Sequence, residues 1–67
     1  MDISIQILRE RVLTMEELKK YNLYELRTML ADEIHWMITT EWYDNEKMKN
    51  LRANENKVWK LIAMGLK

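Results

Sequence analysis

The sequence predicts an all-α protein, a compact three- to four-helix bundle with a C-terminal antiparallel helical hairpin. Two observations predict this fold class. The 67 residues include no proline and one glycine, so the chain has few of the residues that interrupt helices or build β-turns. Long segments also repeat apolar residues every three or four positions, which is the spacing of one helix face. Because the chain is short and shows neither an internal repeat nor a linker, we expect residues 1–67 to form a single helical domain.

The first helix is expected over residues 3–12. Ile5, Leu8 and Val12 follow helical spacing, and Asp2 is a candidate N-cap. Isoleucines also alternate with polar residues at the start of this segment, which is the period of a strand. We favour the helix because the sequence offers no second strand to pair with, and the alternative stays open.

Two capping patterns mark the next helices. Thr14 and Glu17 have the spacing of a capping box, which predicts a short helix over residues 15–20. Asn22 is a second candidate N-cap and predicts a long helix over residues 23–43. The apolar stripe of this long helix consists of Leu23, Leu26, Leu30, Ile34, Met37, Ile38 and Trp42.

The last helix is expected over residues 45–64. Asp44 and Asn45 break the preceding stripe and provide a cap, and Gly65 is well placed to end the helix. The short link between the two long helices favours an antiparallel hairpin. Asn54 interrupts the stripe: either the helix continues with this polar residue at its edge, which we favour, or it breaks near Ala53.

A second apolar series on the long helix gives the main functional signal. Met29, Trp36 and Tyr43 are spaced seven residues apart, so they form a seam beside the leucine stripe. One helix with two apolar seams needs two partners. The N-terminal helix can cover this seam, or another molecule can, and the pattern favours neither. Because interfaces are enriched in aromatic residues and methionine, we expect this seam, together with Trp42 and Trp59, to bind a protein partner.

Charge is divided between the two parts of the chain. Residues 1–45 hold five basic and nine acidic side chains, and residues 46–67 hold six and two, so net charges of −4 and +4 cancel. This pattern suggests an alternative function, in which the C-terminal helix binds nucleic acid or another anionic surface. The candidate contacts are Lys47, Lys49, Arg52, Lys57 and Lys60. The favoured interpretation is that the basic helix packs beside the acidic long helix of its own chain or of a second copy.

Composition argues against an enzyme. The chain has no cysteine and one histidine, so we expect no metal site and no cofactor. Asp32, Glu33 and His35 form the one cluster of side chains that could bind a metal or transfer a proton, and a solvent-facing or hydrogen-bonded His35 is the favoured interpretation. There is no glycine-rich phosphate loop and no nucleophile elbow, and we expect no catalytic residue. No apolar run approaches the 20 or so residues of a membrane span, and no signal peptide is evident, so we expect a cytoplasmic protein.

Two segments resemble known families. Leu13-Thr14 and Glu17-Leu18, followed by Glu25-Leu26-Arg27 and Glu33-Ile34, resemble the first half of the YARHG domain, whose naming motif is replaced here by His35-Trp36-Met37-Ile38. The segment Val58-Trp59-Lys60-Leu61-Ile62 resembles the end of the Hha/YmoA nucleoid-associated proteins. We transfer no residue role and no function from either.

We therefore expect a small non-enzymatic protein-binding module that acts as a regulator, an inhibitor or an assembly adaptor. The sequence does not identify the partner. Such a short chain buries a smaller share of its surface than a larger domain does, so we also expect self-association, with a homodimer as its simplest form.

Overall fold

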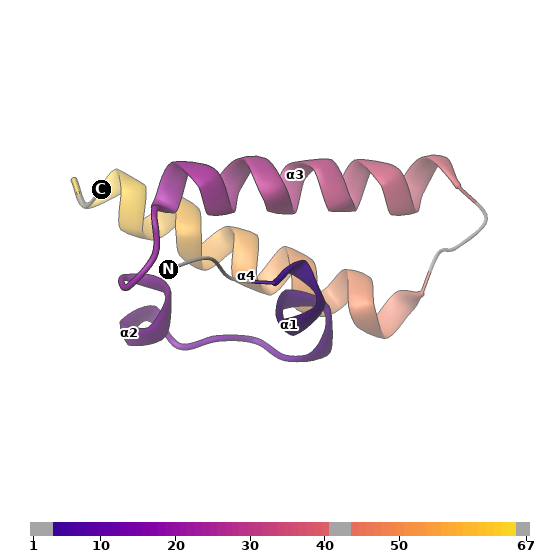
Figure 1. Cartoon of the computed structure of the whole chain (residues 1–67), viewed down its shortest axis with the longest axis horizontal. Coiled ribbons are helices and arrows are strands. Elements are labelled where there is room, and N and C mark those ends of the chain that lie inside the picture. Colours follow the sequence, from indigo (N-terminus) through magenta and orange to yellow (C-terminus); the bar gives the residue numbers. More distant parts are fainter. Residues whose placement is uncertain (1–3, 41–43, 66–67) are drawn as a thin grey trace.

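The computed structural model describes residues 4–40 and 44–65 and confirms the all-α class. It contains four helices: α1 (Ile5–Glu10), α2 (Met15–Leu18), α3 (Leu23–Thr39) and α4 (Asn45–Ala63). No strand occurs in those two ranges. The long helices α3 and α4 lie side by side and run antiparallel, as expected for the hairpin (Figure 1). α1 packs against both long helices, and α2 packs against α4.

Each helix starts at a side chain that caps its free N–H groups. Thr14 and Glu17 form the expected capping box, Asn22 accepts from two backbone N–H groups of α3, and Asp44 accepts from the N–H of Lys47. These three caps confirm the sequence prediction. The expected cap at Asp2 is wrong, because α1 begins two residues later and its N-cap is Ser4. A helix whose first turn is capped needs no support from residues farther upstream.

The helices end earlier than the apolar patterns suggest. α3 was expected to reach residue 43, but Thr40 is already extended, and the Thr39 hydroxyl donates to the carbonyl of His35. Two adjacent β-branched threonines are weak helix formers, so the stripe extends beyond the helix itself. α2 likewise ends at Leu18 rather than at residue 20. Gly65 has a positive φ of 85° just after α4, as expected for the helix stop.

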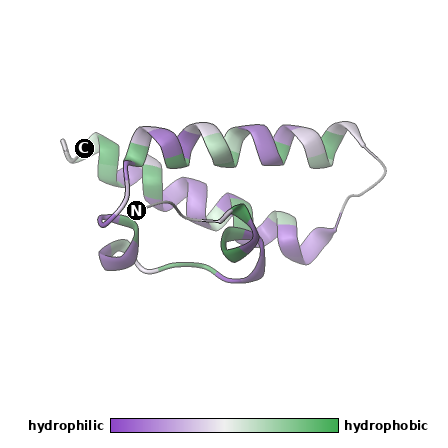
Figure 2. Cartoon of the chain, viewed as in Figure 1, coloured by the Kyte–Doolittle hydropathy of each residue, from purple (hydrophilic) through white to green (hydrophobic). Residues whose placement is uncertain are grey.

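The hydrophobic core is built mainly from leucines of all four helices. Its buried members are Leu8, Leu13, Leu18, Leu23, Leu26, Leu30, Met37, Met48, Leu51, Val58 and Leu61. Figure 2 shows the hydrophobic and hydrophilic turns that alternate along α3, the pattern of a helix buried on one side. Ile38 belongs to the predicted stripe but is 55% exposed. The stripe identifies the side of α3 that faces the core. In the last turn of α3, however, no described element covers the side chain of Ile38.

One polar side chain lies fully inside this core. α4 continues through Asn54, as we favoured, but Asn54 does not lie at the edge: its exposed fraction is 0%. Its side-chain oxygen accepts from the N–H of Leu13 at 2.8 Å, and its amide nitrogen donates to the carbonyls of Leu8 and Arg11, both at 3.0 Å. An asparagine side chain has one acceptor oxygen and two N–H donors. All three functions are therefore used by the end of α1 and the connection that follows it.

Two further side chains of α4 hold the same stretch of backbone. Asn50 donates to the carbonyl of Arg9 at 2.9 Å, and Lys57 donates to the carbonyl of Leu13 at 3.0 Å. The last carbonyls of any helix have no partner within the helix. In α1 these carbonyls are capped by α4, so α4 determines where α1 ends and where the chain turns toward α2.

We expect Asn54→Leu to lower the free energy of unfolding by roughly 2–5 kcal/mol, since it leaves buried carbonyls and a buried N–H without partners. Urea unfolding followed by circular dichroism measures this loss. Asn56→Ala, at an exposed position of the same helix, is the control and should change stability by less than about 0.5 kcal/mol. Equal stability of Asn54→Leu and the wild type would contradict the role assigned to this amide.

The capping box of α2 should make the fold sensitive to acid. The backbone N–H of Thr14 donates to the Glu17 carboxylate and is the main cause that holds its pKa below the ordinary value of 4.5; hydrogen bonding from Arg11 lowers the pKa further. A depressed folded-state pKa contributes stability above the unfolded-state value, and this contribution is lost as the pH falls through the folded-state value. The loss should begin near pH 4.5.

Glu17→Gln should therefore flatten the dependence of the melting temperature on pH below about 4.5. Glutamine still fits a capping box but does not titrate. Thermal unfolding between neutral and acidic pH measures the effect. Glu10→Gln, which removes a carboxylate that forms no ion pair with any described residue, is the control. An unchanged slope in Glu17→Gln would show that other carboxylates determine the acid sensitivity.

Candidate functional site

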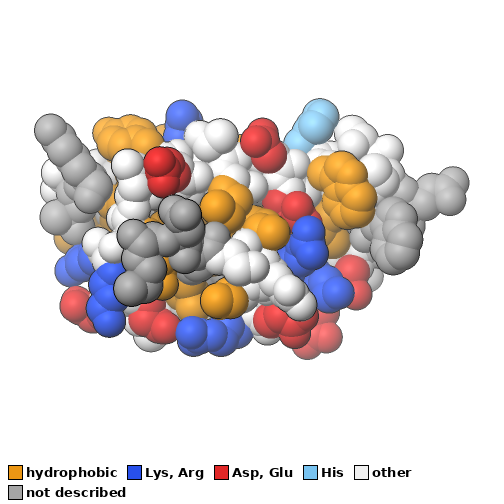
Figure 3. Space-filling view, viewed as in Figure 1, with side chains coloured by type: hydrophobic (Ala, Val, Ile, Leu, Met, Phe, Trp, Pro, Cys, Tyr) orange, Lys and Arg blue, Asp and Glu red, His pale blue; other side chains and the backbone are white. Residues whose placement is uncertain are grey.

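Trp36 lies at the end of the molecule where α1, α3 and α4 meet. Its side chain is 46% exposed. It borders an open groove of about 550 Å³ that Met37 and Glu33 of α3, Arg9 of α1, and Asp44 and Lys47 at the start of α4 also line. In Figure 3 hydrophobic side chains lie among charged ones on the face shown, one of them beside the histidine of α3. The groove therefore combines an exposed indole with charges of both signs.

An ion pair between two helices fixes one wall of this groove. The guanidinium of Arg9, through both Nε and Nη2, donates to one carboxylate oxygen of Glu33. The pair is part-buried, and it joins α1 to α3. The carboxylate of Glu33 therefore binds Arg9 of α1 rather than forming a site with Asp32 and His35, the cluster that the sequence suggested. The pair leaves Trp36, three residues further along α3, at the rim of the groove.

The predicted aromatic seam is only partly present in the described residues. Met29 is partly buried and packs against the core, so the rest of the molecule covers this part of the seam. Trp36 lies seven residues later, on nearly the same side of α3, and is half exposed. Tyr43 and Trp42 lie outside the described residues. Of the two predicted binding residues in the described part of α3, Met29 is partly buried and Trp36 is half exposed, so Trp36 is the one that a partner can reach.

Trp59 is also exposed but belongs to a different face. Its side chain is 47% exposed, and the guanidinium carbon of Arg27 lies 5.1 Å from the centre of its ring. Arg27 precedes Trp36 by nine residues, which is about half a turn around α3 at 3.6 residues per turn. Trp36 and the Arg27–Trp59 pair therefore lie on opposite sides of α3 and present two separate surfaces. That Trp59 binds a partner together with Trp36 stays a prediction.

The basic side chains of α4 differ in their surroundings. Lys57 is bound to the backbone at Leu13 and serves the fold. The others are exposed and form no ion pair with any residue of ranges 4–40 and 44–65: Lys47, Lys49, Arg52 and Lys60. α4 does pack against the acidic long helix α3 of the same chain, as the favoured interpretation expected, although these four cations form no direct ion pair with a described residue of α3. Their pairing with a second copy stays a prediction.

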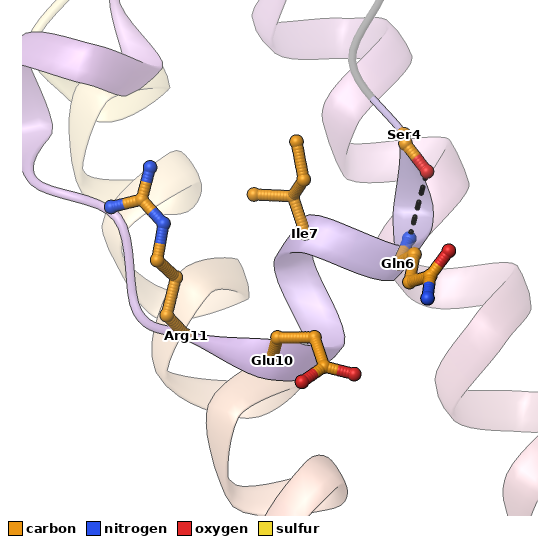
Figure 4. A pocket seen from close by; sticks show the side chains of 5 residues that line it. All are labelled: Ser4, Gln6, Ile7, Glu10 and Arg11. Atoms are coloured by element: carbon orange, nitrogen blue, oxygen red, sulfur yellow. Dashed lines mark hydrogen bonds between the residues drawn. The ribbon is translucent and has the colours of Figure 1, made fainter.

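The described residues contain no group of three or more histidines, cysteines and carboxylates that could hold a metal ion. His35 is exposed, as favoured from the sequence. A further depression on the outer side of α1 is lined by Ser4, Gln6, Ile7, Glu10 and Arg11 (Figure 4). The Ser4 hydroxyl oxygen there already accepts from the Gln6 N–H, and no set of polar groups converges on a common point.

Comparison with known proteins adds no identity: no family model, curated protein or solved structure matches the chain. The two resemblances noted in the sequence therefore carry no argument about function. No helix in the described part of the chain is both long and apolar enough to cross a membrane.

Sequence reasoning missed Arg9, which lines the groove with Trp36, and Arg27, which contacts the Trp59 ring. Arg9 reaches Glu33 and Arg27 reaches Trp59 across 24 and 32 positions of the chain. The predicted hairpin could have indicated the contact between Arg27 and Trp59. In an antiparallel hairpin, residues equally distant from the turn lie beside each other, and Arg27 and Trp59 are about equally distant from residue 43.

We expect the Arg9–Glu33 pair to stabilise the groove. A double-mutant cycle with Arg9→Met and Glu33→Gln should give a coupling energy of about 1 kcal/mol that falls as salt is added. Chemical denaturation of the four proteins measures it. The exposed pair of Lys19 and Glu16 is the matched control and should couple by a few tenths of a kcal/mol at most. Equal coupling in both pairs would show that the Arg9–Glu33 contact does not fix the groove.

Proposed function

We propose that this chain is a small non-enzymatic protein-binding module whose partner surface is built around Trp36. The observation that carries the proposal is the half-exposed indole of Trp36, which lines the groove on α3 beside Met37 and the Arg9–Glu33 pair. Tryptophan and arginine are the residues most enriched among those that dominate binding energy at interfaces. A partner that covers the groove would bury the indole and exclude water from the ion pair.

The arrangement supports binding rather than catalysis. The groove is open, whereas sites for small substrates enclose most of the ligand surface. Among the charged groups of the groove, Arg9 and Glu33 bind each other, and Asp44 and Lys47 are exposed. Trp36 supplies its main exposed apolar surface. A regulator, an inhibitor or an assembly adaptor requires no more than such a surface. Self-association through it is one form of this proposal.

We expect Trp36→Ala to weaken partner binding by about 2 kcal/mol or more, which is roughly 30-fold in Kd. The fold should persist because the side chain is already half exposed. Affinity capture with tagged wild type, Trp36→Ala and Tyr24→Ala, followed by quantitative mass spectrometry, identifies proteins that only Trp36→Ala loses. Calorimetry with the purified protein then gives the change in Kd.

Tyr24→Ala is a matched control because Tyr24 is an exposed aromatic residue on the same helix, about a third of a turn away. Its capture profile should equal that of the wild type. An unfolded Trp36→Ala protein, judged by its helical circular dichroism, would mean that Trp36 is a core residue. A folded variant that retains every captured protein would place the binding surface elsewhere.

A second candidate function is favoured by one observation, the exposed cations of α4 that form no ion pair with a described residue, among them Lys49 and Lys60. A helix with this charge can bind nucleic acid or another anionic surface. The acidic exposed side chains of α3, Glu25 and Asp32, count against it. Absence of duplex binding at low salt would end this candidate.

A further inference from the structure

The α3–α4 hairpin has a face that no described residue covers. α1 and its connection bind α4 through Asn50, Asn54 and Lys57. Trp59 lies five residues after Asn54, about 140° further around α4, and therefore on another side of the helix. On α3, Arg27 points away from Trp36 by about half a turn. The contact between Arg27 and Trp59 shows that these two sides form one continuous face.

We call this surface the open face. It consists of one stripe of residues on α3 and one stripe on α4. Ala31 and Ile38 lie within about 40° of Arg27 around α3, and Arg52 lies within about 20° of Trp59 around α4. Its members are Arg27, Ala31, Ile38, Arg52 and Trp59. Ile38 and Trp59 are about half exposed, so the open face presents large apolar side chains together with two arginines.

Arg27 has unused hydrogen-bonding capacity on this face. Its guanidinium is held against the Trp59 ring at 5.1 Å. Its Nε is buried and has no hydrogen-bond partner among the described residues, and no described carboxylate pairs with it. A buried charged donor without an acceptor costs free energy. The described part of this chain gives the guanidinium no carboxylate, and a carboxylate of another molecule that meets its outer nitrogens is the acceptor that matches its planar donors.

The charge around the open face favours an acidic partner. Arg27, Arg52 and the neighbouring Lys49 are free of ion pairs with described residues. One acidic residue, Glu55, lies about 40° from Trp59 around α4, so the three cations outnumber it. A second copy would meet this face with the same cations across a two-fold axis, so the cations would repel. Nucleic acid would use the cations but leave Ala31 and Ile38 without an apolar contact.

We propose that the open face binds an amphipathic helix of another protein, whose carboxylates flank its apolar stripe. Its apolar residues, at helical spacing, would cover Ile38 and Trp59, and a carboxylate would accept hydrogen bonds from Arg27. The proposal goes beyond the Trp36 surface and does not depend on it, because the two lie on opposite sides of α3. The same molecule can then hold two partners at once.

A display library of helical peptides about 20 residues long, randomised at surface positions, tests this proposal with the full chain as bait. Selected peptides should be rich in aspartate and glutamate beside apolar residues at positions i, i+3, i+4 and i+7. Their Kd, measured by fluorescence anisotropy, should rise at least about tenfold with Trp59→Ala and with Arg27→Gln. In ¹⁵N spectra, the Arg27 Nε–H and the Trp59 indole N–H should shift on binding.

A second test variant and a control variant complete this experiment. Ile38→Ala removes an exposed side chain and should weaken binding even where Trp59→Ala disturbs the hairpin. Ile7→Ala removes an exposed isoleucine of α1, outside both proposed surfaces, and should leave the Kd unchanged. Because no variant alters the Trp36 groove, failure here leaves the Trp36 proposal intact, and failure of Trp36→Ala to lose partners leaves this one intact.

Several results would overturn the proposal. Selected peptides that are neutral or basic would do so, as would acidic peptides that bind Trp59→Ala as tightly as the wild type. Sedimentation velocity that shows a dimer dissolved by Ile38→Ala would assign the open face to a second copy. A labelled DNA duplex whose binding is lost in Ile38→Ala would assign it to nucleic acid.

Discussion

The buried amide of Asn54 is the interaction on which the rest of the structure depends. α1 has six residues and α2 has four, and helices this short are not stable in water by themselves. They persist because α4 supplies partners for the backbone that joins them, through Asn54 above all. Leu8 and Leu13 can enter the core only because their neighbouring polar groups are satisfied there. A polar residue thus organises the packing of the apolar ones.

The same constraint determines which surfaces stay exposed. Because Asn50, Asn54 and Lys57 hold the N-terminal segment on one side of α4, that segment covers one side of the hairpin and leaves the other uncovered. The Arg9–Glu33 pair then brings α1 against α3 without covering Trp36. The described residues therefore leave Trp36 and Trp59 each about half exposed.

The sequence predicted what depends on near neighbours. The caps at Thr14, Asn22 and Asp44 were correct because cap and helix lie within a few residues of each other. Asn54 was placed at the edge because its partners lie 41 to 46 positions away, where periodicity carries no information. Ile38 was assigned to the stripe correctly, but periodicity gives the direction of a side chain, not whether another element covers it.

The exposed tryptophans show how this limit bears on function. Composition named both Trp36 and Trp59 as partner-binding residues, because interfaces are enriched in tryptophan. Half a turn of α3 separates the side that holds Trp36 from the side that holds Arg27 and Trp59. The polar groups near the two indoles therefore differ. The Arg9–Glu33 pair lines the groove beside Trp36, and Arg27, whose Nε has no partner among the described residues, lies against Trp59. Two separate surfaces of different charge can select different partners, because specificity depends on the polar groups around an apolar anchor as much as on the anchor.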